Sequence, residues 1–190
     1  MTRATASESL AELKQTLRSR RRFLLQAAGG SLALLFGSAS RANPHSPDAW
    51  QTLDAVLRHL FPSEPDAPGA TEIHALAYLR RTTEDPFIDS DERAFIPRGA
   101  GWLDEVAQKA HARPFHTLNA AKRESTLRFI AARPVGENWV STLLVYVLEA
   151  LLTAPAYGGN PNGIGWRWLR HTPGFPLPDA DTLYWKLPRA

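Results

Sequence analysis

The sequence WVSTLLVYVLEALL, residues 139–152, decides the fold. Eight of these fourteen residues are valine or leucine, and on a helix they leave hardly any polar face. A helix that is apolar on nearly all sides is either the central helix of a core or one that docks on a partner. A membrane-spanning helix needs about 20 apolar residues, so we expect this shorter run not to cross a membrane.

Apolar residues at helical spacing also occur before this run. Ser46-Pro47-Asp48 is a typical helix start, and apolar residues then recur at intervals of three and four from Trp50 to Phe61. We expect further helices at residues 73–79, 95–106 and 120–132. Pro97 is expected to kink or split the second of these. Because no alternating strand pattern or internal repeat is present, we predict an all-α domain of about five helices over residues 43–154.

Residues 155–190 differ in composition from the helical part. They are rich in glycine, proline and large aromatic residues, and residues 157–166 read YGGNPNGIGW. We expect a long irregular tail that lies extended across a surface. Tryptophan and arginine dominate binding hot spots, so Trp166, Arg167 and Trp168 fit a docking face. The alternative is that these rings cover the core of this domain itself.

The N-terminal segment has the pattern of a twin-arginine export signal, a route that carries folded proteins. The motif residues are Arg20, Arg21, Phe23 and Leu24. A short apolar segment follows up to Phe36, and a run of small residues ends at Ala42. We therefore interpret residues 1–42 as a signal peptide. The alternatives are an uncleaved N-terminal tether and a buried amphipathic helix.

The charge of the chain is concentrated in this N-terminal segment. The 190 residues include 22 basic and 19 acidic ones, a net charge of +3. Seven basic and two acidic residues lie in residues 1–42, so the remaining 15 basic and 17 acidic residues give a net charge of −2. Nucleic acid is therefore not an expected partner. The chain has no cysteine, which excludes thiolate-bound iron–sulfur clusters and haem c attachment on it.

No pattern of catalytic, cofactor-binding or metal-ligating residues is evident. The six histidines form no zinc motif, and the glycines near residue 160 do not have the spacing of a dinucleotide-binding loop. We expect a helix C-terminal turn in which Gly158 or Gly159 is left-handed and Asn160 bonds to the turn backbone. Glu149 either caps backbone donors of this loop or marks the exposed edge of its helix.

A helix that ends near an acid and is followed by P-x-Y-G-G-N-x-x-x-x-G-W resembles the gluconate 2-dehydrogenase subunit 3 family. The matching residues are Glu149, Pro155, Tyr157, Gly158, Gly159, Asn160, Gly165 and Trp166. One departure is Arg170-His171-Thr172, where the family pattern leads us to expect a glycine–aromatic pair. This departure concerns which partner and substrate the complex has, rather than membership of the family.

The resemblance implies a non-catalytic small subunit that pairs with a large FAD-dependent dehydrogenase. In such complexes the large subunit oxidises a sugar or sugar acid by hydride transfer to FAD, and a membrane-bound c-type cytochrome subunit carries haem c. The small subunit would stabilise the large one and supply its signal for the twin-arginine translocase. The complex would be periplasmic and membrane-associated. The partner interface would comprise Glu149, Tyr157, Gly158, Gly159, Asn160, Gly165, Trp166, Arg167 and Trp168.

Two other functions stay open from the sequence. The first is a stand-alone periplasmic enzyme with a site near Glu149, Asn160 and His171. The second is a transient export chaperone that releases its cargo.

Overall fold

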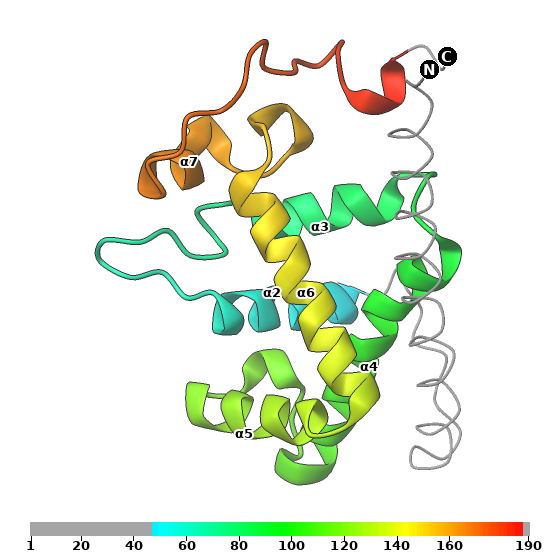
Figure 1. Ribbon diagram of the computed structural model, residues 1–190. Helices are drawn as coiled ribbons and strands as arrows, with labels where there is room; N and C mark the ends of the chain where they lie inside the picture. The colour runs from blue at the N-terminus through cyan, green and yellow to red at the C-terminus, as the bar shows by residue number, and fades with distance from the viewer. Residues whose placement is uncertain (1–46, 188–190) are drawn as a thin grey trace, which may run out of the picture.

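The computed structural model describes residues 47–187 and confirms the all-α prediction (Figure 1). The helices are α2 (Pro47–Leu60), α3 (Ala75–Glu84), α4 (Ser90–His111), α5 (Ala120–Ala131), α6 (Pro134–Leu152) and α7 (Ile164–Trp168). Single 3-10 turns are η1 (Phe115–Thr117), η2 (Pro155–Tyr157), η3 (Pro161–Gly163) and η4 (Tyr184–Lys186). The predicted export motif at Arg20, Arg21, Phe23 and Leu24 lies outside the described residues.

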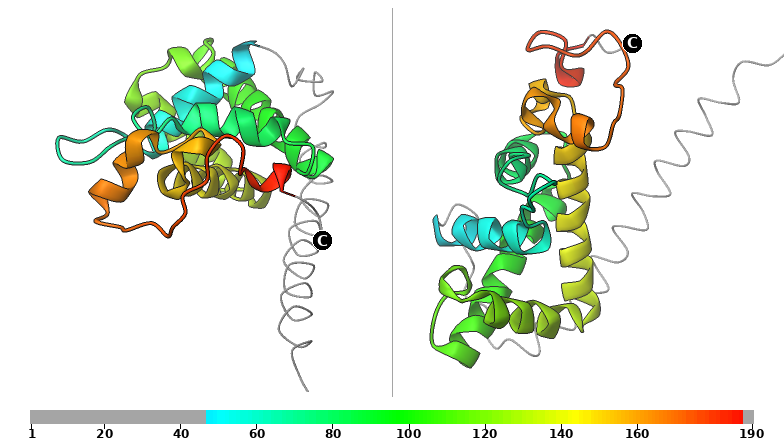
Figure 2. Two further views of the ribbon diagram at one scale, coloured as in Figure 1. Left: turned by 90° about the horizontal axis from the view of Figure 1, so that it is seen from above. Right: turned by 90° about the vertical axis from the view of Figure 1, so that its left-hand side faces the viewer.

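Helix α6 is the element around which the others pack. It contacts α2, α3, α4, α5 and α7, and both Figure 1 and Figure 2 show it as the outermost helix on one side. One face is fully buried, with Trp139, Leu143 and Ala150 at its centre. Of the two interpretations of residues 139–152, the structure shows the central helix of the core.

Helix α6 begins five residues earlier than the apolar run, because Pro134 occupies its first turn, where its missing N–H costs nothing. At 19 residues it is the one described helix that is long and apolar enough to cross a membrane. Half of this stretch is buried inside the fold, however, and the core helix of a soluble protein meets the same criterion. The expectation from fourteen residues alone therefore underestimated the length of the helix.

Helices α4 and α6 meet at Trp139, whose side chain is completely buried. Its indole Nε1 donates a hydrogen bond to the carbonyl of Ile96 at 2.9 Å. The ring lies directly on Gly99, where an added Cβ would come within 2.1 Å of Nε1. Pro97 lies inside α4 and does not split it, so that part of the prediction is wrong. The buried indole pairs with a carbonyl next to the proline and packs this stretch against α6.

Polar contacts join the other helices to this pair. The carboxylate of Asp104 on α4 accepts from the Thr52 hydroxyl of α2 at 2.8 Å and from the backbone N–H of Phe115 at 2.9 Å. His59 at the end of α2 lies 2.7 Å from the Glu124 carboxylate of α5. These contacts fix α2 between α4 and α5.

The chain after α6 forms short turns, the five-residue helix α7 and an extended stretch that passes over one end of the molecule (Figure 2). Near its end, Tyr184 stacks on Tyr157 with the ring centroids 6.0 Å apart. The Tyr184 backbone N–H donates to the Tyr157 hydroxyl at 3.2 Å, and the Tyr184 hydroxyl donates to Asp85. The tail is therefore attached both to η2 and to the end of α3.

Candidate functional site

Asn160 is the centre of the glycine-rich motif and is completely buried. Its side-chain Nδ2 donates to the carbonyl of Thr153 at 3.0 Å, and its Oδ1 accepts from the N–H of Gly165 at 2.7 Å. Its backbone N–H donates to the carbonyl of Ile73 at 3.0 Å. This one residue links the end of α6, the segment before α3 and the start of α7. The predicted bonding of Asn160 to the turn backbone is confirmed.

The glycines of the motif are required by backbone conformation and by close packing. Gly158 has a φ of 95°, so the left-handed residue that we expected after the helix is Gly158. A Cβ on Gly159 would lie 2.7 Å from the carbonyl oxygen of Ala150, and one on Gly165 would lie 2.2 Å from that of Leu151. The loop therefore lies directly against the last turn of α6.

Trp166 also belongs to this packed region. Its side chain is 9% exposed, and its Nε1 donates to the carbonyl of Leu152 at 2.8 Å. The last carbonyls of a helix have no partner within the helix, so this bond satisfies one of them. In the described chain, the ring covers the core of its own domain, which is the alternative that the sequence left open.

Three residues of the predicted interface are exposed: Glu149, Arg167 and Trp168. Trp168 packs edge-on against Phe61 with the centroids 6.3 Å apart. The exposed position of Glu149 agrees with the second of its two interpretations, the exposed edge of the helix. Tyr157 and Gly158 are partly buried, and the other four predicted residues are buried.

The carboxylate of Glu149 accepts a hydrogen bond from the Tyr78 hydroxyl of α3 at 3.4 Å. Burial, together with the Glu149 charge beside it, raises the pKa of Tyr78 to about 12. Tyr78 therefore stays protonated at neutral pH and acts as a donor.

The arrangement gives little support to a catalytic site at Glu149, Asn160 and His171. Both ends of the Asn160 amide are occupied by backbone groups, whereas His171 is exposed and its ring centroid lies 6.4 Å from that of Trp166. Within residues 47–187, no group of three or more histidine, aspartate or glutamate side chains is placed to hold a metal ion.

A different surface stands out, which we call the α6 outer face: Leu144, Val145, Leu148 and Leu152. These four side chains are 38–54% exposed and follow one another along the side of α6 opposite its buried face. No other described helix lies over this side in Figure 1 or Figure 2. Contiguous exposed apolar side chains on a rigid helix are typical of protein–protein contact sites. Sequence reasoning missed this face, because a run that is apolar all round does not reveal which side is buried.

The described part of the chain is a small helical domain with a buried loop motif and an apolar outer helix face. The model of the family described as gluconate 2-dehydrogenase subunit 3 matches residues 47–174, and the chain belongs to this family. It is thus an accessory subunit of the gluconate 2-dehydrogenase type, from a dehydrogenase complex of several subunits. No curated protein and no solved structure matched the chain.

Proposed function

We propose that the chain is the non-catalytic small subunit of a periplasmic, membrane-associated, flavin-dependent dehydrogenase of sugars or sugar acids. It stabilises a large FAD-containing subunit and supplies the twin-arginine signal that exports the pair. The observation that carries this proposal is the α6 outer face, an exposed apolar surface on a chain that belongs to a family of dehydrogenase subunits.

Cofactor chemistry is assigned to the partners in this proposal. Haem c is attached through cysteines, and this chain has none, so a cytochrome subunit is needed to carry it. FAD is assigned to the large subunit, where the hydride of the substrate is accepted. An export route for folded proteins suits a pair in which the cofactor is inserted before transport.

The α6 outer face is suited to a permanent subunit contact. Its side chains stand on the central helix, whose opposite face is packed into the core, so the surface is held rigid before binding. Glu149 lies on the same exposed side, next to Leu148, and gives the edge of the contact a polar group. Arg167 and Trp168 are further exposed groups accessible to the large subunit.

The interface is tested by replacing Leu144 and Leu148 together with glutamine, which keeps helix propensity and adds no charge. Reburial of two leucines in an interface is worth about 3 kcal/mol, so we expect roughly 100-fold weaker binding of the large subunit. The melting temperature of the isolated chain should fall by only a few degrees, because these side chains are about half exposed. Binding is measured by surface plasmon resonance or by pull-down at graded concentrations.

The matched control is Phe87→Gln, which removes an equally exposed apolar side chain between α3 and α4. It should leave binding unchanged. Equal losses in the control and in the double variant would mean that the contact is elsewhere or is non-specific.

The subunit proposal itself is tested by tagging the C-terminus and isolating the protein from periplasm and membranes. We expect a stoichiometric large subunit with flavin absorbance in the same fraction. Changing Arg20 and Arg21 to lysine should keep both proteins in the cytoplasm, whereas Arg18→Lys should not. A colourless chain without partner would contradict the subunit role. If the chain were found bound only to the large subunit that has not yet left the cytoplasm, it would be a transient export chaperone and not a permanent subunit.

A further inference from the structure

Residues 172–182 form a strap, the part of the C-terminal tail that spans two points of attachment. At its first end, the His171 backbone N–H donates to the carbonyl of the buried Trp166 at 2.8 Å. At its second end, Leu183 is 3% exposed, and Tyr184 makes the contacts to η2 and α3 described above. The strap is therefore held on the folded domain at both ends.

The strap itself is stiff. Three of residues 172–178 are proline, whose ring fixes φ and leaves the chain few conformations. A tight turn follows, in which one carboxylate oxygen of Asp179 accepts from the backbone N–H groups of Asp181 at 2.8 Å and Thr182 at 2.9 Å. These bonds, first among them the one from Asp181, lower the pKa of the Asp179 carboxyl, so it is charged at neutral pH and can accept them. The shape of the strap is thus set before a partner binds.

Phe175 is the most prominent side chain of the strap. It is 82% exposed, more than any other large apolar side chain that the structure describes. Leu177, two residues further on, is 40% exposed, and a Cβ on Gly174 would have no atom within 4 Å. Aromatic side chains on a preformed backbone are typical anchors of protein interfaces, because little conformational freedom is lost when they bind. Phe175 contributes little to the packing of its own domain and is available to a partner.

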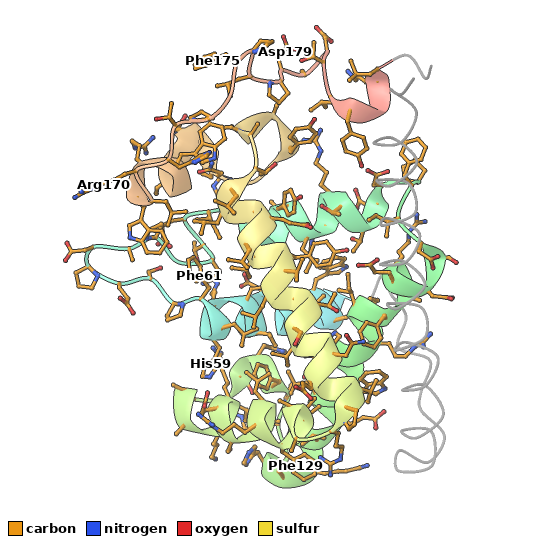
Figure 3. All side chains as sticks on the ribbon, in the orientation of Figure 1. His59, Phe61, Phe129, Arg170, Phe175 and Asp179 are labelled. Carbon is orange, nitrogen blue, oxygen red and sulfur yellow. The ribbon has the colours of Figure 1, made fainter. Side chains whose placement is uncertain are left out.

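The strap lies on the same side of the molecule as the α6 outer face. In the right-hand view of Figure 2, part of it extends beyond α6 on the side away from the other helices. Phe175 lies at the upper end of the molecule in Figure 3, opposite Phe129. The α6 outer face ends at Leu152, whose carbonyl accepts the Trp166 indole N–H, so it leads directly to the start of the strap. A partner that covers the α6 outer face up to Leu152 therefore reaches the strap.

We propose that Phe175 anchors the chain to the large subunit: its ring is buried in an apolar pocket of that subunit, with Leu177 at the edge of the contact. The inference rests on the proposed function, because it extends the contact made by the α6 outer face. The large subunit is the occupant because one partner can cover both surfaces, which are held on the same folded domain. A pocket for one aromatic ring also gives specificity, since a large subunit without it gains nothing from the strap.

Phe175→Ala tests the anchor in the complex of the full chain with the large subunit. Loss of one buried phenylalanine side chain should weaken binding about 30-fold in surface plasmon resonance. The melting temperature of the free chain should stay within about 2 °C, because the side chain is 82% exposed there. Phe175→Leu keeps part of the apolar surface, so its affinity should fall between those of the native chain and Phe175→Ala.

The matched control is Phe129→Ala, at the opposite end of the molecule, where the phenylalanine is 49% exposed. It should leave binding unchanged. Equal binding by the native chain and Phe175→Ala, or an equal loss in the control, would overturn the proposal.

Photo-crosslinking identifies the occupant. With p-benzoylphenylalanine in place of Phe175, irradiation of the isolated complex should join the chain to the large subunit, and in place of Phe129 it should not. A crosslink to the cytochrome subunit or to a second copy of the chain, or no crosslink at all, would contradict the proposal.

The same measurements separate this inference from the proposed function. If the native chain binds the large subunit and only the double variant of Leu144 and Leu148 is weakened, the subunit role stands and Phe175 is not an anchor. If the native chain itself does not bind the large subunit, the proposed function fails, and the anchor fails with it.

Discussion

Gly99→Ala is expected to destabilise the protein by about 2 kcal/mol. The new Cβ would lie 2.1 Å from Nε1 of Trp139 and 2.3 Å from two further ring atoms, far inside van der Waals contact. The ring is fully buried and held by its bond to Ile96, so α4 and α6 have to move apart. Overpacking of this kind costs about 1–3 kcal/mol or more, and it outweighs the roughly 1 kcal/mol that alanine gains over glycine in a helix. Urea denaturation of the purified chain measures the loss.

Two controls separate the steric cause from a general effect of the substitution. Gly174→Ala places a methyl group where nothing lies within 4 Å, so its urea midpoint should be unchanged. In a Trp139→Phe background the smaller ring leaves room, and Gly99→Ala should cost less than it does in the native background. Additive losses in the double variant would contradict the contact between Gly99 and Trp139.

Asn160→Gly is expected to cost about 3 kcal/mol. Asn160 has a φ of 49°, and glycine keeps this left-handed conformation, so only the amide is lost. The buried N–H of Gly165 and the partly buried carbonyl of Thr153 then lose their partner, at about 1–3 kcal/mol for each group. Asn160→Ala should cost about 1 kcal/mol more, because alanine also strains the left-handed backbone.

Asn162 provides the matched control, since it has a φ of 54° but an exposed side chain. Asn162→Gly should leave the free energy of unfolding unchanged. If Asn160→Gly were as mild as this control, the buried amide would not be what holds the loop. Both variants are compared by urea denaturation under identical conditions.

Much of the helical architecture could be predicted from local pattern. For α2 and α5, the capping residues and the apolar spacing predicted the ends of the helices to within about two residues of those observed. Helix α4 was harder, because Pro97 suggested a break, whereas the helix continues through this residue. The start of α6 was also missed because of a proline. Pro134 was interpreted as the end of the preceding helix, but it lies in the first turn of α6.

The sites were less predictable, because they depend on which faces meet in three dimensions. The motif around Asn160 was found from the sequence, but its order along the chain did not reveal that Asn160, Gly165 and Trp166 are buried. The α6 outer face could not be separated from its buried face, because both carry leucine and valine.

The bond from Asn160 to Ile73 joins two segments that are almost half the chain apart. During synthesis, α2 and α3 leave the ribosome long before Asn160 does, so the bond to the Ile73 carbonyl cannot form until the C-terminal part arrives. Assembly of this domain is therefore completed late in translation, and a chain truncated before Asn160 lacks the residue that closes it. Under the proposed export route, the signal is made first and the contact that completes the fold is made near the end.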